Sequence, residues 1–593
     1  MLGDYSKHKD KDPVQTVQHI QATLDGLGLS KSLLWTSRQF DGTCSNRVSI
    51  DGTSLGANGK GTTEEYATAS GYAELMERLQ NKFIGKRTHV TETYARYGFY
   101  DFPDERLVVA EDVLAQHDEV IDGWLDGWGL HKDAERLRFL KDVSAKFYQR
   151  DDGMLAEVPF ADVFAGGVRW LPPSLYLQLY GTNGMSAGNT MEECLVQGLS
   201  EVFERCVQLK ILRSEAVPPR ILCEELAAWS VGDLIGRIEQ SGRYRVYVYD
   251  GSLGKGYPVV VTVIVDRFRG TFGVKCGAHP SLAIAVERTL TEAFQGRDVD
   301  SFTGINDIAP PAQVARSENL FTMIVDGEGV YPASLFVGEP SWGYEPWPSD
   351  EGLTNSELLG RMVGLLRNDG HTLLVRNASF LGFPTCHILV PGMSETFENT
   401  PEEYALLRAK WVARAAVSRF PQVTPEQQER MLALEREGLN NARLIDFNLP
   451  FVGGKMYGPR LFGFLHLARE EFGAARGCFL EQEKAVPLPG SLYWQAMARY
   501  AGWREEGLSH EDALGLIRAL YLPVVSRSVA RDAEPCPHML ARQFPQMSCF
   551  DCESCELAAA GGCAAPADAE AFAKINAAMA NSDVTQESIL ELF

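Results

Sequence analysis

The sequence lacks the features that would point first to a membrane or a nucleic acid. Its longest apolar run, at residues 257–265, is far too short to cross a bilayer. Basic residues are in deficit, because 56 Lys and Arg face 79 Asp and Glu for a formal net charge of -23. Broad nucleic-acid binding needs a basic face instead. The N-terminal residues are polar and contain no apolar signal core. We therefore expect a cytoplasmic protein without membrane or direct nucleic-acid contacts, in which converging carboxylates need cations.

Cysteine is scarce along most of the chain and crowded near its C-terminal end. The sequence has 12 cysteines in 593 residues. The tail, defined as residues 531–593, contains Cys536, Cys549, Cys552, Cys555 and Cys563. Thiolates at C-x2-C-x2-C spacing suit a zinc ion or an iron–sulfur cluster, and spacing alone does not select the metal. The tail is therefore predicted to hold a metal site, with unligated or redox cysteines as the alternative.

Hydrophobic patterning divides the rest of the chain near residue 400. Before it, helical and β patterns alternate, which favours an α+β fold with antiparallel sheets. Three β-rich runs separated by turn residues predict a meander at residues 244–249, 257–267 and 271–276. Residues 58–61 (NGKG) read as a turn and residues 175–180 as a short strand. Residues 401–530 predict an all-helical, TPR-like module for protein contact or homodimerisation.

A spaced pattern occurs twice. Residues 61–78 and 188–205 both read G-x-T-x-E-x5-G-x2-E-x2-E-R without a gap. Each copy follows a glycine-rich segment and is expected to open a helix. Residues i and i+3 share a helix face. The paired carboxylates of the two copies are Glu74 with Glu77, and Glu201 with Glu204.

These carboxylates predict a metal site. Adjacent carboxylates repel one another, and burying them requires a compensating positive charge. Mg²⁺ takes one or two carboxylates and fills its other positions with water and phosphate oxygens. A third predicted helix adds Arg288 and Glu292. The sequence therefore predicts a magnesium–triphosphate site between two pseudo-symmetric helices, although no Walker motif is present. The alternative is two solvated, charged helix faces.

A shorter motif competes with this interpretation. Residues 184–188 fit G-x-S-x-G, the nucleophile elbow of serine hydrolases, with Ser186 as the nucleophile. A hydrolase also needs an acid and a histidine; His279, His371 and His387 lie downstream without a signature. This hypothesis leaves the repeated pattern unexplained.

The repeat and its neighbours together resemble the YcaO family. The stretches that carry the resemblance are residues 58–79, 181–205, 248–261, 272–297 and 389–395. The resemblance implies a YcaO-type ATP-binding domain over residues 1–400, with ATP in a non-Walker site and Mg²⁺ held by glutamates. It further implies that ATP activates a peptide amide by phosphorylating its oxygen. A thiol, hydroxyl or sulfide then displaces the phosphorylated oxygen.

The resemblance also assigns roles to residues. It implies Glu74, Glu77, Glu201 and Glu204 as magnesium ligands, with Glu77, Glu204 and Arg205 as the catalytic group. It implies nucleotide or metal contacts for Lys9, Thr16, Ser186, Asn189, Gln197, Arg205, Arg288 and Glu292. Thr16 stands where the family has a serine. On this view Ser186 serves nucleotide binding and not hydrolysis.

Partners follow from the same resemblance. Stand-alone members of the family are associated with β-methylthiolation of a small-subunit ribosomal protein, as accessories of a radical methylthiotransferase. The implied partners are a peptide or ribosomal protein substrate and that methylthiotransferase. The alternative is a non-catalytic, ATP-binding accessory that relays sulfur through its Cys-rich tail.

Overall fold

The computed structural model describes residues 7–38, 42–84, 90–148, 153–227, 229–304, 306–396, 399–417, 424–440, 443–449, 452–486, 488–534 and 564–593. The chain forms two units: Met1–Asn399 with Ala567–Phe593, and Thr400–Pro566. The five tail cysteines predicted to bind metal lie outside the described residues.

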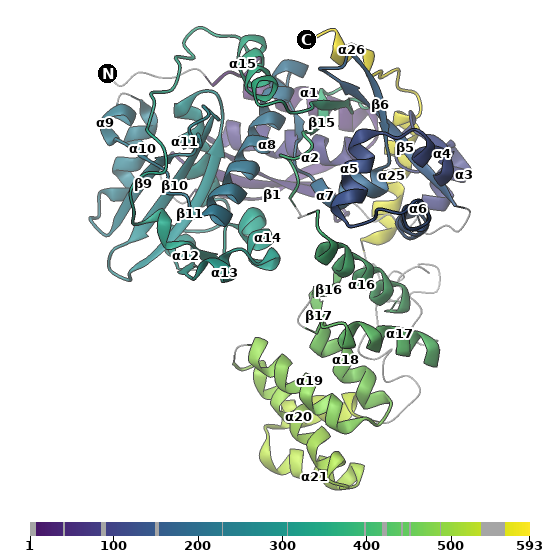
Figure 1. The fold of residues 1–593 in the computed structure, drawn as a ribbon. Helices are drawn as coiled ribbons and strands as arrows, with labels where there is room; N and C mark the ends of the chain where they lie inside the picture. The colour runs from purple at the N-terminus through teal and green to yellow at the C-terminus, as the bar shows by residue number, and fades with distance from the viewer. Residues whose placement is uncertain are drawn as a thin grey trace. The chain divides into compact units, whose positions relative to one another are not determined.

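Three antiparallel sheets form the framework of the first unit (Figure 1). The 3-stranded sheet contains β1 (Lys31–Ser37), β2 (Cys44–Ile50) and β3 (Gly56–Gly61). The 4-stranded sheet runs β11 (Thr271–Ala278), β10 (Val259–Asp266), β9 (Tyr244–Asp250), β8 (Arg220–Ile221). The 6-stranded sheet runs β4 (Arg106–Val109), β5 (Met154–Asp162), β14 (Leu374–Asn377), β15 (Thr385–Leu389), β7 (Met185–Ala187), with β6 (Gly167–Leu171) on β5. The meander predicted from the three β-rich runs is confirmed as β9–β10–β11. The prediction of an α+β fold with antiparallel sheets is confirmed.

Strand β10 explains the longest apolar run of the sequence. Alternate residues of a strand point to opposite faces. Val259, Val261 and Val263 belong to the core that contains α8 (Met191–Ser214). Val260 and Ile264 belong to a second core with α11 (Leu282–Ala293). Because helices cover both faces, the inner positions of β10 are apolar except Thr262, whose hydroxyl accepts a hydrogen bond from Thr289 of α11 at 2.7 Å.

Further helices and short strands complete the first unit. The ones that bear on the site are α1 (Pro13–Gly26), α2 (Glu64–Gln80), α7 (Pro173–Tyr180), α10 (Ser230–Glu239) and α15 (Asn355–Asn368). The others are α3 (Val90–Tyr97), α4 (Ala110–Ala115), α5 (Glu119–Gly127), α6 (Asp133–Tyr148), α9 (Cys223–Leu226), α12 (Val299–Thr303), β12 (Asp307–Ile308), α13 (Pro311–Val314), α14 (Ser317–Asp326), β13 (Val330–Tyr331) and η2 (Ala333–Leu335).

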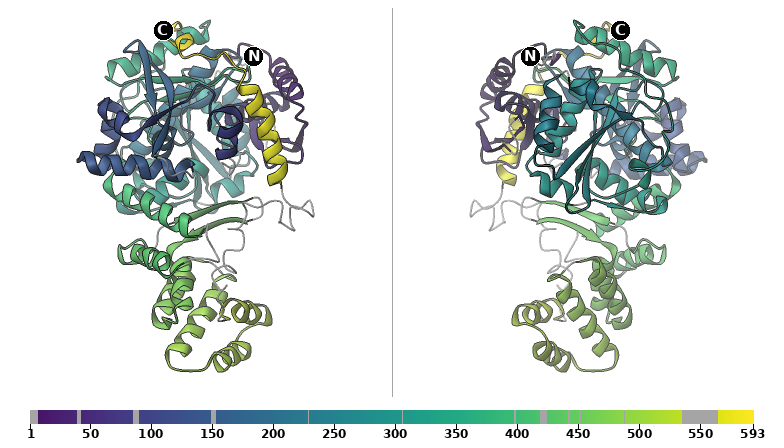
Figure 2. Two further views of the ribbon diagram at one scale, coloured as in Figure 1. Left: turned by 90° about the vertical axis from the view of Figure 1, so that its right-hand side faces the viewer. Right: turned by 90° about the vertical axis from the view of Figure 1, so that its left-hand side faces the viewer.

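The last residues of the chain fold with the first unit. Helix α25 (Ala565–Met579) lies beside the N-terminal elements, drawn in yellow and purple in Figure 2. Asp568 accepts hydrogen bonds from the backbone and hydroxyl of Ser54 at 2.7 and 2.5 Å. On α26 (Glu587–Leu590), Ile589 is fully buried in the core that also contains α8. Residues 567–593 of the predicted tail therefore belong to the first unit and complete its packing.

The second unit is mainly helical. Its helices are α16 (Pro401–Val417), α17 (Pro425–Arg436), α18 (Gly458–Ala468), α19 (Phe472–Ala485), α20 (Ser491–Glu505), α21 (His510–Leu520) and α22 (Pro523–Asp532). They share one apolar core. The unit also contains an antiparallel hairpin of β16 (Arg443–Leu449) and β17 (Val452–Tyr457), which the sequence prediction missed. Among the described residues, no helix combines the length and apolar character needed to span a membrane.

Two local predictions were wrong. Residues 58–61 lie in β3 and pair with β2 instead of forming a turn. Residues 175–180 lie in helix α7, which begins at Pro173 and ends before Gly181. Proline at the first helical position and glycine just past the end are the helix signals that a run of alternating Leu and Tyr obscured.

Candidate active site

The two copies of the repeat fold as the same strand–cap–helix unit. In the first, β3 leads into α2; in the second, β7 leads into α8. Thr63 caps α2 by accepting a hydrogen bond from the Tyr66 amide at 3.3 Å. Thr190 caps α8 in the same way, from the Glu193 amide at 3.2 Å. The shared threonine is thus the N-cap that starts each helix, and the expectation that each copy opens a helix is confirmed.

The second shared glycine lets each helix approach its strand closely. A Cβ atom on Gly71 would lie 2.8 Å from Val48 Cγ2. A Cβ atom on Gly198 would lie 2.7 Å from Ser186 Oγ. Both separations are well inside van der Waals contact, so a larger residue would push the helix outward. This close packing sets the position of the carboxylates that follow on each helix.

The carboxylates of the two helices influence one another electrostatically. Burial raises the pKa of Glu77 well above its usual range, and Glu201 and Glu74 add to the shift against the opposing Arg78. Burial also raises the pKa of Glu201. Burial and the nearby Glu292 raise the pKa of Glu204 to about 7. Burial therefore disfavours the ionised form of all three carboxyl groups. Glu74 lies at its rim, with a side chain 37% exposed.

Basic side chains surround this cluster. Arg78 lies 3.3 Å from Glu77, and Arg205 lies 3.8 Å from Glu201. Lys60 of β3 is ion-paired with Glu292 of α11, and Lys275 of β11 lies 3.9 Å from the same carboxylate. Although burial opposes it, these two lysines lower the pKa of Glu292 to about 2.

Arg288 of α11 links the third helix to α8. Its guanidinium donates hydrogen bonds to the Ala278 carbonyl at 2.6 Å and to Gln197 of α8. Burial lowers the pKa of Arg288, although Glu204 and Glu292 oppose the shift. The structure thus brings the predicted Gln197, Arg288 and Glu292 to the same place as the repeat carboxylates.

The residues present fit a divalent cation and a polyphosphate. Three carboxylates with raised pKa values are the ligands that Mg²⁺ would compensate. The Nη1 atom of Arg78 is buried and has no hydrogen-bond partner among the described residues. An unpaired buried donor beside a carboxylate cluster is costly unless an acceptor, such as a phosphate oxygen, joins it.

The N-terminal residues form a second hydrogen-bonded group. Thr16 of α1 donates to Asn189 Oδ1 at 2.7 Å, and Asn189 donates to Glu193 at 3.0 and 3.2 Å. Lys9 lies 3.0 Å from Glu193, and despite burial it lowers the pKa of that carboxyl. The predicted Lys9, Thr16 and Asn189 therefore converge on one carboxylate. The carboxylate cluster and this N-terminal group adjoin at His279. Burial lowers the pKa of His279, and the nearby Arg288, His8 and Lys9 lower it further.

Ser186 lies apart from the charged groups. Its side chain is fully buried, and its hydroxyl donates to the Cys194 carbonyl at 2.7 Å. The ring of His387 is directed elsewhere, 3.2 Å from the Asn183 carbonyl. The G-x-S-x-G segment therefore forms a strand-to-helix contact, and this geometry does not support the hydrolase hypothesis.

Several residues of the site were missed by sequence reasoning. Lys60 directly precedes the first copy of the repeat, which is a usable signal. Glu193 stands three residues after its N-cap Thr190, the spacing of a capping box. Lys275 carries no signal of its own, because only the packing of α11 against β11 places it near Glu292.

A cavity of about 270 Å³ opens where α2 begins. Its lining includes Lys7, Thr63, Tyr66, Arg237 and Glu287. Glu287 directly precedes Arg288 on α11.

Comparisons with known proteins agree with the resemblance. The family model described as YcaO cyclodehydratase, ATP- and Mg²⁺-binding, matches residues 58–394. The chain is 32% identical over 357 residues to the ribosomal protein S12 methylthiotransferase accessory factor YcaO of Escherichia coli (strain K12), covering 57% of each protein. It is 32% identical over 347 residues to an uncharacterized protein of Haemophilus influenzae, covering 58% of this chain and 57% of that one. A solved heterocyclase in complex with substrate and cofactor aligns at a TM-score of 0.45 and 18% identity, over 66% of this chain and 54% of the other. The match thus spans little more than half the length of the curated relatives.

Proposed function

Since the chain belongs to the YcaO family, we propose that it is an ATP- and Mg²⁺-dependent enzyme that activates a peptide amide. The family is an ATP- and Mg²⁺-binding one. When bound, ATP supplies the phosphoryl group that turns the amide oxygen into a leaving group, and Mg²⁺ offsets the phosphate charge.

One observation carries this proposal. Helices α2 and α8 hold Glu77, Glu201 and Glu204 in one cluster, where their pKa values are raised. Ordinary surface carboxylates have no reason to lose their charge in this way. A bound cation would restore the ionised form of all three and would remove the cost of burying them.

The residues divide into three roles. The glutamates of the repeat, Glu74, Glu77, Glu201 and Glu204, hold the metal. Lys60, Lys275 and Arg288 offer positive charge to the phosphates, and Arg205 faces the same cluster from α8. Lys9, Thr16 and Asn189 orient the nucleotide from the N-terminal side. Binding the phosphates between these basic groups aligns them for transfer and excludes water.

The proposal is tested by measuring ADP and phosphate release with Mg²⁺ in the presence of ribosomal proteins from cells that lack this chain. Glu204→Gln removes one metal ligand while it preserves size, and we expect turnover to fall about 100-fold. Glu65→Gln is the matched control, because Glu65 belongs to the same repeat but is exposed. Failure of the wild-type chain to bind ATP would refute the proposal.

The substrate is proposed from the relative. The Escherichia coli protein is an accessory factor of a ribosomal protein methylthiotransferase. We therefore propose a ribosomal protein as the peptide substrate and a methylthiotransferase as the partner. The test compares the masses of ribosomal proteins from cells with and without the chain. A second candidate, the non-catalytic sulfur-relay accessory, would bind ATP tightly without turning it over even when substrate is supplied.

The remaining parts of the chain also carry proposals. We propose that residues 401–530 mediate protein contact or homodimerisation, which light scattering of the purified chain measures directly. We propose that the five tail cysteines bind zinc or an iron–sulfur cluster. Metal analysis and a visible absorbance spectrum of protein purified without oxygen would distinguish the two, and a colourless, metal-free protein would exclude both.

A further inference from the structure

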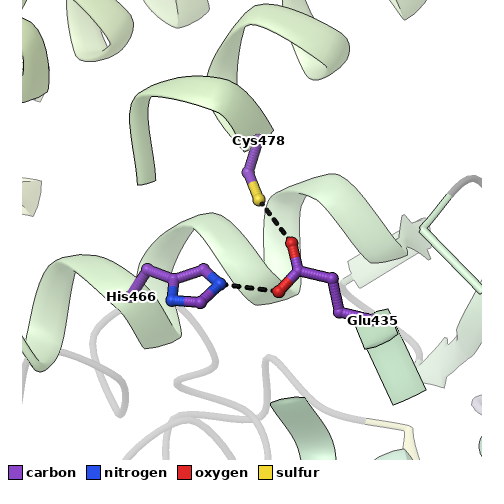
Figure 3. Close-up of side chains that lie close together, drawn as sticks. All are labelled: Glu435, His466 and Cys478. Atoms are coloured by element: carbon purple, nitrogen blue, oxygen red, sulfur yellow. Dashed lines mark hydrogen bonds and ion pairs between the residues drawn. The ribbon is translucent and has the colours of Figure 1, made fainter. Parts of the chain in front are cut away.

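Three helices of the second unit converge on a small polar cluster at the edge of the unit's apolar core. Glu435 lies on α17, His466 on α18 and Cys478 on α19. Figure 3 shows the three side chains pointing toward one another. The residues around them, such as Leu465 and Phe479, are fully buried.

The potential ligand atoms are close enough to share one ion. His466 Nε2 lies 2.6 Å from Glu435 Oε2, and Cys478 Sγ lies 3.2 Å from Glu435 Oε1. The three ligand atoms all lie within 4.8 Å of one another. His466 and Cys478 are each only 8% exposed. An ion between them would therefore be largely shielded from water.

A fourth side chain fixes the orientation of the histidine. Glu471 Oε2 lies 2.6 Å from His466 Nδ1, on the far side of the ring. Its other oxygen accepts a hydrogen bond from Arg469 Nε at 2.8 Å. Metal-binding histidines typically donate their second ring N–H to a carboxylate, which sets the tautomer and directs the free nitrogen to the metal. Glu471 is thus placed as a positioning residue.

We propose that Glu435, His466 and Cys478 bind a zinc ion that ties α17, α18 and α19 together. Imidazole, thiolate and carboxylate are the three ligand types that zinc accepts in proteins. Three protein ligands leave the fourth tetrahedral position for water or an external ligand. Binding releases the Cys478 thiol proton and the proton shared between His466 Nε2 and Glu435. The site is independent of the ATP site and does not rest on the proposed function.

The competing explanation is a hydrogen-bonded cluster that never binds metal. Burial and the adjacent Glu435 raise the pKa of the Cys478 thiol, so without metal the thiol keeps its proton and donates to that carboxylate. Metal binding and a buried hydrogen bond make different predictions for cobalt spectra, because only a thiolate bound to Co²⁺ gives a sulfur-to-metal charge-transfer band.

The experiment uses the full chain with Cys536, Cys549, Cys552, Cys555 and Cys563 replaced by serine, so that the tail contributes no thiolate ligand. We expect this background to bind one equivalent of Zn²⁺, and Co²⁺ to give the charge-transfer band. Cys478→Ser should abolish the band. Glu471→Gln should weaken zinc binding about 10- to 100-fold. Glu481→Gln, on the same helix but exposed and paired with Lys484, should change neither.

Two results would overturn the proposal. One is a background protein that binds no stoichiometric zinc at micromolar concentration. The other is a charge-transfer band that survives in Cys478→Ser. If Cys478→Ser does not fold, Glu435→Gln provides the same test, because it keeps the side chain's size but loses the anionic ligand. Retention of full zinc affinity by Glu435→Gln would likewise refute the site.

Discussion

Replacing Gly198 by alanine tests whether the repeat glycines hold the two helices against their strands. The added Cβ would lie 2.7 Å from Ser186 Oγ, 2.9 Å from Ile388 Cδ1 and 3.1 Å from the Gly184 carbonyl oxygen. Overpacking of this kind costs about 1–3 kcal/mol. Alanine regains about 1 kcal/mol of helix propensity. The expected net destabilisation is about 1 kcal/mol, and α8 would move outward.

The matched control is Gly360→Ala on α15, where a Cβ atom meets nothing within 4 Å. There only the propensity gain applies, and we expect stabilisation of about 1 kcal/mol. The two variants are expected to differ by about 2 kcal/mol, so calorimetry should separate their unfolding temperatures by about 2 °C in a unit of this size. Hydrogen exchange of α8 peptides would identify the first unit's transition. Mg²⁺–ATP affinity should fall only in Gly198→Ala. If Gly198→Ala unfolds at or above the temperature of Gly360→Ala, the close-packing argument fails.

Three further predictions concern charge. Burial lowers the pKa of His387 to about 3. The stability that neutral His387 contributes is therefore complete above pH 6.5 and is lost as pH falls toward 3, at up to about 1.4 kcal/mol per pH unit. Urea unfolding between pH 6.5 and 4.5 should show a smaller change of unfolding free energy with pH in His387→Gln than in the wild type, and an equal change would contradict the assignment. Lys60→Met leaves Glu292 with Lys275 as its remaining lysine partner and should destabilise the chain by about 2 kcal/mol. The double variant Lys60→Met with Glu292→Met should recover part of that loss. If thermal unfolding shows no recovery, Lys60 and Glu292 are not coupled. Because the pKa of Glu204 is about 7, protons compete with Mg²⁺ for this carboxylate. The apparent Mg²⁺ affinity should therefore rise about tenfold from pH 6 to pH 8. Calorimetric titration should show a weaker pH dependence of this affinity in Glu204→Gln, and the same pH dependence in both proteins would exclude Glu204 as a ligand.

The repeat could be predicted from the sequence because its residues act locally. Thr63 and Thr190 cap the helices that they precede, and the i, i+3 spacing places the glutamates of each helix on one face. These relations depend on a few neighbouring residues, so a sequence pattern contains them. The resemblance to the family then added the residues of the N-terminal segment, which lie far away along the chain, and assigned roles to the α11 residues that the sequence had already singled out.

Other features could not be read from the sequence because they depend on pairing between distant segments. The NGKG segment reads as a turn, yet β2 pairs with it and makes it an edge of a sheet. Lys275 reaches Glu292 only because β11 and α11 pack together. The cluster of Glu435, His466 and Cys478 draws on three helices, none of which carries a metal-binding spacing of its own.

The most direct test of the account is a calorimetric titration of the full chain with ATP, with and without Mg²⁺. We predict Mg²⁺-dependent binding at one site, weakened in Glu204→Gln and in Glu77→Gln and unchanged in Glu65→Gln. Binding that is independent of Mg²⁺, or that survives loss of both buried glutamates, would contradict the claim that the two copies of the repeat form the metal–nucleotide site.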